Sequence, residues 1–324
     1  MAFRLKLVPD ETHINWFRVQ WLTFGISAVL MVASVIVTIV MGLNFGIDFR
    51  GGTTIRAETS TTIDVGEYRS AMGTLGLDDV AITEVFDPTF GPDRHVAQIR
   101  LAAGEGDAAV TPEELRRIET ALKAVDPDVR FTAVESVGPK VSAELIKTAI
   151  YAVAAATFGI MVYIWLRFEW QFAIGAVVAL IHDVLLTVGL FSLFQIRFDL
   201  STIAALLTIV GYSINDTVVV FDRCRENLIK YKNMPLIDIM NLTVNETLSR
   251  TVMTAVTTIL ALGALMIWGG DVIRAFVFAM LWGVTVGCYS TLYMAKNIVL
   301  WLGVKRDWSK PDKDKLPDAF REAP

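Results

Sequence analysis

The sequence predicts an α-helical polytopic membrane protein with six transmembrane helices and a ferredoxin-like α+β domain between the first two. Three observations lead to this prediction. Hydrophobic residues make up 54% of the 324-residue chain, and its mean hydropathy is +0.51, whereas soluble domains contain roughly 45–50% apolar residues. Six apolar segments are about as long as the ~20 helical residues that cross a bilayer. Of 29 basic and 34 acidic residues, only Asp183 and Asp216 lie inside those segments.

The six segments occupy residues 22–41, 148–166, 170–194, 200–221, 251–270 and 275–295. This distribution excludes a soluble enzyme, a disordered protein and a protein with a single membrane anchor. The first segment follows a charged leader, residues 1–21, and its full spanning length predicts a retained helix, because the apolar region of a signal peptide has only ~7–15 residues. The net charge of −5 argues against nucleic acid as a partner.

Lysine and arginine residues predict the orientation of the spans, because they accumulate in cytoplasmic loops. The leader carries three of them, the loop at residues 222–250 carries five, and the tail at residues 302–324 carries six. The short connections on the alternate side carry one each, Arg197 and Arg274. Both termini and the 222–250 loop are therefore predicted to be cytoplasmic, with residues 42–147 on the opposite side.

Residues 42–147 have the pattern of a small α+β domain. Strands are predicted at residues 53–58, 80–86, 95–101 and 129–134, and helices at residues 64–75 and 111–125. Thr111, Pro112 and Glu114 form a typical helix start, with an N-cap, a proline in the first turn and an acidic residue after it. The order β-α-β-β-α-β is that of ferredoxin-like domains.

This segment shows no spacing of His, Cys, Asp and Glu typical of a metal site and no nucleophile motif. It is therefore predicted to bind a partner or transmit force rather than to catalyse a reaction, and neither a cofactor nor a metal is expected for the chain. The two cysteines, Cys224 and Cys288, lie outside the segment, so no disulfide framework is expected.

The intramembrane carboxylates are candidate proton-relay groups. An aspartate at the centre of a span costs at least about 2.5 kcal/mol, and such residues usually mark ion pathways. Asp216 lies about two-thirds along the fourth segment, and Asp183, preceded by His182, lies near the middle of the third. Arg250, just before the fifth segment, is placed to reach the depth of Asp216. An aspartate that exchanges cationic and hydroxyl partners has an energy that depends on its protonation.

Other polar side chains are candidates for supporting this relay. Thr254, Thr257 and Thr258 follow Arg250 at i+4, i+7 and i+8 and share one helix face with it. Ser213 and Asn215 lie within one turn of Asp216. A simpler interpretation stays open, in which the buried polar groups only hold helices together and Arg250 only sets orientation. Gly283 and Gly287 in the sixth segment indicate close helix packing.

Five motifs occur in order along the chain. The first two are FGIDFRGGT at residues 45–53 and VGPKVSAEL at residues 137–145. The others are His182-Asp183, GYSINDTVVVFDRCREN at residues 211–227, and Ser249-Arg250-Thr251 with its threonine-rich continuation. Together they resemble the signature of the bacterial SecD/SecF protein-export family, which is related to the RND superfamily of transporters. The resemblance covers roughly residues 20–300.

The resemblance implies one subunit of a SecD–SecF complex, which is not an enzyme and uses the proton-motive force to assist Sec-dependent preprotein translocation. It implies the bacterial inner membrane, a periplasmic domain, and SecD, SecYEG, YajC, YidC, unfolded preprotein and membrane lipid as partners. The family's proton-site aspartate matches Asp216 and its arginine partner matches Arg250. The chain does not contain the SecD half, so part of the proton path is expected to lie outside this sequence.

Two glycine-containing motifs are candidate hinges between the spans and the domain. They comprise Gly46, Asp48, Gly51 and Gly52 before the first strand, and Gly138 and Pro139 before the second span. Ordinary turns are the alternative interpretation.

Two other functions stay open on the sequence alone. Half of an RND-type small-molecule or ion exporter shares the spans and aspartates, although a substrate vestibule calls for a larger external region. An intramembrane aspartyl protease would use Asp183 and Asp216 as a dyad that shares a proton. At ~1.5 Å per residue, the two carboxylates are expected to differ by about 12 Å in depth, which disfavours the dyad.

Overall fold

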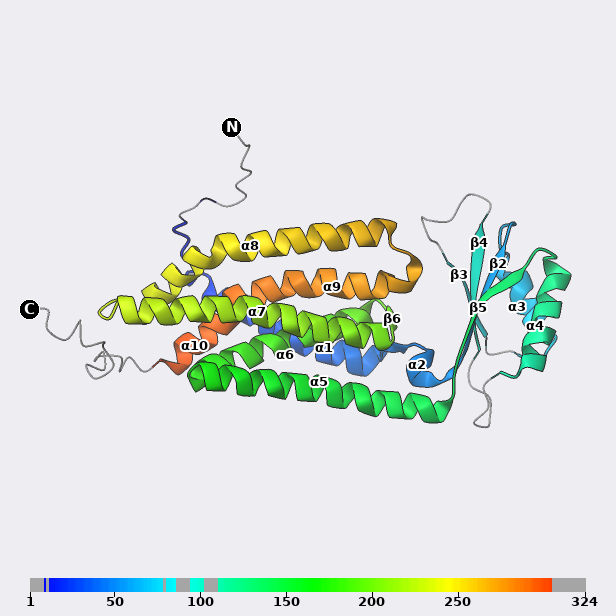
Figure 1. Cartoon of the computed structure of the whole chain (residues 1–324), viewed down its shortest axis with the longest axis horizontal. Helices are drawn as coiled ribbons and strands as arrows, with labels where there is room; N and C mark the ends of the chain where they lie inside the picture. Colours follow the sequence, from blue (N-terminus) through cyan, green and yellow to red (C-terminus); the bar gives the residue numbers. More distant parts are fainter. Residues whose placement is uncertain (1–8, 10–11, 78–79, 86–93, 102–109, 305–324) are drawn as a thin grey trace, which may run out of the picture.

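The computed structural model describes residues 9, 12–77, 80–85, 94–101 and 110–304 (Figure 1). Within these residues six helical segments are long and apolar enough to cross a membrane, as predicted. The first five contain α1 (Gln20–Met41), α5 (Pro139–Arg167), α6 (Trp170–Leu193), α7 (Leu200–Lys230) and α8 (Leu236–Trp268). The sixth consists of α9 (Asp271–Ser290), the π-helical turn η1 (Thr291–Ala295) and α10 (Lys296–Leu302).

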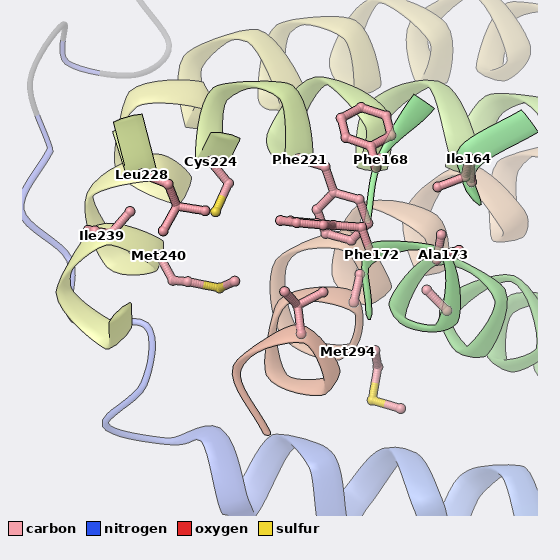
Figure 2. Close-up of a cluster of buried hydrophobic side chains, with 14 of the residues drawn as sticks. Ile164, Phe168, Phe172, Ala173, Phe221, Cys224, Leu228, Ile239, Met240 and Met294 are labelled. Carbon is pink, nitrogen blue, oxygen red and sulfur yellow. The ribbon is translucent and has the colours of Figure 1, made fainter. Parts of the chain in front are cut away.

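The helices lie side by side along the long axis of the molecule, and the α+β domain lies at one end (Figure 1). α6, α7 and the helices of the sixth span are the most buried, whereas α1, α5 and α8 bury few of their residues. At the end far from the domain, Phe172 of α6 packs edge-on against Phe221 of α7, with ring centroids 4.9 Å apart. Figure 2 shows these two rings between Cys224 and Met240 on one side and Ala173 on the other. The bundle core is therefore formed chiefly by α6, α7 and the sixth span.

The fourth and fifth spans extend well beyond their apolar windows. The segment expected as a loop, residues 222–250, is helical except for residues 231–235, because α7 continues to Lys230 and α8 begins at Leu236. Arg223 on α7 forms an ion pair with Glu246 on α8 at 2.8 Å, and Asn227 donates to the same carboxylate at 2.7 Å. These polar contacts let two charged helix ends pack together where hydropathy predicted a loop.

The segment before α1 lies along α8. The amide N–H groups of Ile14 and Trp16 donate to the side-chain oxygens of Asn245 and Asn241, at 3.0 and 2.9 Å. Asn245 in turn donates to the carbonyl of Ile14 at 2.9 Å. Because the two asparagines are four residues apart, they lie one turn apart on one helix face and hold a strip of main chain.

The domain contains β2 (Gly52–Thr59), α3 (Val65–Gly73), β3 (Val80–Val85), β4 (His95–Leu101), α4 (Pro112–Val125) and β5 (Arg130–Val137). This is the predicted order β-α-β-β-α-β, and the strands form one antiparallel sheet in the order β3-β4-β2-β5. Thr111 and Glu114 form a capping box at the start of α4, as the sequence indicated. Both helices cover the face of the sheet that points away from the bundle (Figure 1).

Asp126, at the end of α4, ties this helix to the sheet. Its carboxylate accepts hydrogen bonds from Thr59, from Thr61 at 2.8 Å and from Tyr68 at 3.4 Å. Burial acts to raise the pKa of Asp126, but the hydrogen bonds outweigh it and hold the pKa below its usual value. Burial and the neighbouring Asp126 charge raise the pKa of Tyr68 to about 12. The charged carboxylate is therefore part of the folded domain.

Candidate functional site

Asp183 lies where the third, fourth and sixth spans meet, and it is fully buried. Its Oδ2 accepts hydrogen bonds from Ser213 on α7 at 2.7 Å and from Ser290 on α9 at 2.8 Å. Its Oδ1 lies 3.0 Å from Nδ1 of His182, and the His182 ring stacks on Tyr289 with centroids 6.0 Å apart. One carboxylate thus joins side chains from three spans.

Small residues on α9 allow this close approach. A Cβ added at Gly287 would lie 3.3 Å from the Cβ of Ser213 and 3.7 Å from Oδ2 of Asp183. One turn earlier, a Cβ at Gly283 would lie only 2.3 Å from Cγ1 of Ile209 on α7. The close packing that the two glycines indicated therefore occurs, and it presses α9 against the polar face of α7.

Asp216 lies one turn further along α7 than Ser213 and is 7% exposed. Its Oδ1 accepts a hydrogen bond from Thr251 on α8 at 2.8 Å. Its Oδ2 has no hydrogen-bond partner in the described part of the chain. The next residue, Thr217, shares a hydrogen bond of 2.9 Å with Thr291 in the π-helical turn. Single π-helical turns occur frequently at functional sites.

The two carboxylates are closer in depth than expected. Asp183 contacts Ser213, which precedes Asp216 by three residues, a rise of about 4.5 Å along α7. The expected offset of 12 Å treated both spans as upright and level, and the actual packing of α6 against α7 does not follow that assumption. Each carboxylate has its own partners, and none of the hydrogen bonds in the described residues joins them. The hydroxyl partners of the two carboxylates come from different residues, which does not favour a proton-sharing protease dyad.

The contact expected between Arg250 and Asp216 is not formed. Arg250 is exposed, and no ion pair joins it to Asp216 within 4 Å in the described residues, although its charge lies near enough to act on the carboxylate. The hydroxyls of Thr254, Thr257 and Thr258 bond to carbonyls of their own helix and do not reach the carboxylate. The inward face of α8 instead carries Thr251, the residue after Arg250.

Asn215 on α7 is likewise exposed, whereas its near neighbour Ser213 is buried. The polar groups singled out in the sequence therefore fall into two sets. The inward set surrounds Asp183 and Asp216, and the outward set (Asn215, Arg250, Thr254 and Thr257) lies on exposed faces of α7 and α8.

Sequence reasoning missed a buried charge, Lys296, at the start of α10. It is 1% exposed, and its Nζ has no hydrogen-bond partner among the described residues. The ammonium lies 4.1 Å from the ring centroid of Phe17 and 5.4 Å from that of Tyr293. A cation over aromatic faces is stabilised by the ring quadrupole. Two features of the sequence could have indicated this site. A lysine directly follows the sixth apolar segment, and the aromatic pair Trp16-Phe17 precedes the first apolar segment.

A second cluster joins the first span to the fourth, at the end of the bundle near the domain. β1 (Asn44–Phe45) pairs in parallel with β6 (Arg197–Phe198), and the N–H of Gly46 donates to the carbonyl of Phe198 at 2.8 Å. Asp48, in the short helix α2 (Ile47–Arg50), accepts the N–H of Leu200 at 3.0 Å. The predicted hinge residue Asp48 therefore caps the first turn of α7, the helix that carries Asp216.

Two of the hinge glycines have conformations that require glycine. Gly51 has φ of 74° and Gly52 has φ of 125°, values that other residues rarely adopt. Gly138 is an extended N-cap, and α5 begins at Pro139, nine residues before the expected span. Ser142 on α5 donates to the carbonyl of Ile47 at 3.3 Å. The two motifs therefore meet at α2, between α5 and α7.

Comparison with known sequences identifies two matching regions. Residues 117–305 match the family described as "Protein export membrane protein SecD/SecF, C-terminal", and residues 36–63 match the "SecD/SecF GG Motif". The chain is 63% identical over 312 residues to protein translocase subunit SecF of Cereibacter sphaeroides, and 64% identical over 318 residues to that of Rhodobacter capsulatus. In both comparisons the alignment covers 96% of each chain.

Two solved structures resemble the fold. The crystal structure of SecDF, a translocon-associated membrane protein from Thermus thermophilus, superposes with a TM-score of 0.81 at 32% identity. The superposition covers 91% of this chain but 39% of the SecDF chain. A second SecDF structure, in a super-membrane-facing form, gives a TM-score of 0.67 at 34% identity, over 92% of this chain and 40% of the other. This chain thus corresponds to about two-fifths of each SecDF chain.

Proposed function

This chain belongs to the SecD/SecF family of protein-export membrane proteins, and from that premise we propose that it couples proton movement through Asp216 to Sec-dependent preprotein translocation. The observation that carries the proposal is the environment of this carboxylate. It is buried among membrane spans, it has one hydroxyl partner, and its second oxygen has no partner in the described residues. Such a group gains or loses a proton with a large change in its interactions.

The energy available is sufficient for a conformational cycle. One proton that crosses the membrane gains ~2.3 kcal/mol per 100 mV of potential and ~1.4 kcal/mol per pH unit. A combined ~4 kcal/mol biases a two-state equilibrium by roughly 10³. When Asp216 is ionised it accepts the hydroxyl of Thr251, and when it is protonated Oδ2 becomes a donor that needs an acceptor. The two states therefore favour different arrangements of α7 and α8.

The proposed relay includes Asp183 and His182, because Ser213 links their cluster to the helix that carries Asp216. A change in the position of α7 alters the contact of Asp183 with Ser213 directly. In this arrangement Asp183 and His182 hold α6, α7 and α9 in register, and Asp216 exchanges the proton.

The exposed polar groups favour a second subunit that packs against this chain. They are Asn215, Arg250, Thr254 and Thr257. Polar and charged groups facing lipid are costly, and the neighbouring helices α7 and α8 both expose such groups. We place a SecD-type half on this face, which supplies the part of the path outside this chain. Arg250 then exchanges with Thr251 as the partner of Asp216 when the two halves move. The match of this chain to about two-fifths of SecDF supports a second half.

Movement reaches the domain through the α2 joint. Asp48 bonds the first turn of α7, and Gly51 and Gly52 lead directly into β2. A shift of α7 therefore moves the start of the sheet. We propose that Gly46, Gly51, Gly52, Gly138 and Pro139 form the hinge, that the domain is periplasmic, and that both termini are cytoplasmic in a bacterial inner membrane. SecYEG, YajC, YidC, lipid and the unfolded preprotein are the proposed partners.

The test replaces Asp216 by asparagine in cells that depend on this subunit. Asp216→Asn keeps the shape and the hydrogen bond to Thr251 but cannot ionise, so we expect proton-dependent export to be lost while the protein stays inserted. Thr251→Val removes the partner and is expected to reduce export severalfold. Thr285→Val is the control, since its exposed hydroxyl bonds only the carbonyl of Leu281. Full export by Asp216→Asn would contradict the proposal.

A further inference from the structure

A cavity of about 620 Å³ lies between the uncovered face of the sheet and the neighbouring end of the bundle. This volume is within the ~300–1,000 Å³ of typical ligand pockets. The sheet supplies Arg56, Thr83, Glu84, Val85, Gln98, Arg100 and Glu135. The bundle end supplies Ile196, Arg197, Met266, Arg274, Ala275 and Phe278. The relay described above does not use this cavity.

The polar wall follows from strand alternation. Successive side chains of a strand point to opposite faces, so Ile55 and Ile99 pack under the helices while Arg56, Gln98 and Arg100 face the bundle. Arg56 pairs with Gln98 across β2 and β4, and Gln98 pairs with Thr83 across β4 and β3. The exposed side of the sheet therefore carries a continuous polar row opposite the span ends.

The lining is rich in hydrogen-bond donors. Four arginines line the cavity against two glutamates, and one of these, Glu84, already binds His95 at 3.1 Å. Arg197 also lies 3.5 Å from Asp199. Gln98 is only 4% exposed, and its oxygen accepts from Arg100 at 3.5 Å. Its Nε2 is fully buried and has no partner among the described residues, so the wall of the cavity holds an unpartnered donor just below its surface.

We propose that this cavity binds the phosphate of an anionic phospholipid headgroup. Guanidinium groups match phosphate oxygens in geometry and charge, and four of them line this cavity. The lipid source is favoured by the opposite wall, where Ile196, Met266 and Phe278 are apolar side chains on the domain-side ends of candidate membrane spans and their connections. The proposed lipid site depends on the membrane spans and not on proton coupling. Only the choice of leaflet, the outer one, depends on the proposed orientation of the chain.

A bound headgroup would join the domain to the membrane surface. Arg56 belongs to the sheet and Arg197 belongs to the connection before α7, so a phosphate held by both would bridge the domain and the bundle. The domain would then keep a preferred position over the bundle in anionic membranes and lose it in neutral ones.

The experiment titrates the purified full-length chain in detergent with dioleoyl phosphatidylglycerol or dioleoyl phosphatidylcholine and counts bound lipids by native mass spectrometry. We expect phosphatidylglycerol to bind at least tenfold more tightly than phosphatidylcholine. The double variant Arg56→Gln/Arg197→Gln should lose at least tenfold in phosphatidylglycerol affinity. Its matched control is Arg116→Gln/Arg117→Gln, which removes the same charge from the exposed side of α4 and should leave affinity unchanged.

A third arm adds inorganic phosphate at millimolar concentration. Displacement of phosphatidylglycerol from the wild type, and not from the Arg56/Arg197 variant, would support the site. Phosphate binding without any preference for the anionic lipid would overturn the lipid source. Equal losses in the two double variants would show that net charge alone governs binding and would overturn the site. Lipid binding is read without export, so a failure here leaves the proposed proton coupling untouched.

Discussion

Replacing Gly283 by alanine adds a single methyl group where α9 meets α7. The new Cβ would lie 2.3, 2.4 and 2.8 Å from Cγ1, Cδ1 and Cγ2 of Ile209, whereas carbon atoms pack at ~3.5–4.0 Å. The helices must therefore separate by about 1 Å or Ile209 must leave its rotamer. Overpacking of this kind typically costs about 1–3 kcal/mol. Ser290 lies two turns further along α9, so the separation would also lengthen its contact with Asp183.

The second replacement identifies the cause. Ile209→Ala removes all three of the atoms in question, and alone it should cost about 2–5 kcal/mol through the cavity it leaves. In the double variant the alanine at 283 occupies part of that cavity. The combined cost should therefore be smaller than the sum of the single costs by about 1–3 kcal/mol. Gly263→Ala on α8 is the control, because nothing lies within 4 Å of its added Cβ.

The chain provides its own probe of unfolding. Cys224 and Cys288 are free, and Cys224 is 2% exposed. A thiol-reactive fluorophore in detergent therefore reports the temperature at which the bundle opens. At roughly 2–4 °C per kcal/mol, Gly283→Ala should lower the midpoint by roughly 2–12 °C, and Gly263→Ala should not lower it. Additive losses in the double variant would refute the steric argument, as would a Gly283→Ala midpoint equal to that of the wild type.

Three further changes test other parts of the structure. Lys296→Met should raise the midpoint of thermal unfolding, because desolvation of the buried ammonium costs several kcal/mol and its described neighbours offer only aromatic faces as partners. A lower midpoint would show that Lys296 stabilises the bundle. Asp126→Asn should cost the domain about 2 kcal/mol at pH 7. The folded-state pKa of Asp126 is lowered, so its contribution is present above the unfolded pKa of about 4 and is lost as pH falls through the folded value. Protection from hydrogen exchange in β2 should therefore fall towards pH 3 in the wild type more than in the variant. Asp48→Asn weakens the charged cap on the N–H of Leu200 and should speed exchange in the first turn of α7, with export reduced; unchanged exchange there would count against the joint.

The apolar windows were sufficient to locate the spans but not their ends. Within a bilayer, length and hydropathy decide where a helix lies, and all six windows coincide with helices. Outside the bilayer, contacts between individual side chains determine where a helix ends. The contact of Arg223 with Glu246 extends two helices through residues that hydropathy assigns to a loop, and no window average detects such a pair.

The site was predictable only in part, for a related reason. Asp183 and Asp216 stand out against an apolar background, so composition alone singles them out. Serine and threonine do not, because they are common in spans and often bond their own backbone. Whether Thr251 or Thr254 faces inward depends on the rotation of α8, and one residue corresponds to 100°. That rotation is set by packing against α7 and α9, which a single sequence does not contain.

The strip of main chain held by Asn241 and Asn245 has a consequence for biosynthesis. Its two binding residues are translated more than 220 positions after the strip itself, as the separations of 225 and 231 residues show. The amino-terminal strip therefore waits, without its partners, until the fifth span has been made and inserted. Attachment of the earliest part of the polypeptide is then among the last steps of assembly, and a protease that cleaves ahead of α1 would distinguish unfinished chains from completed ones.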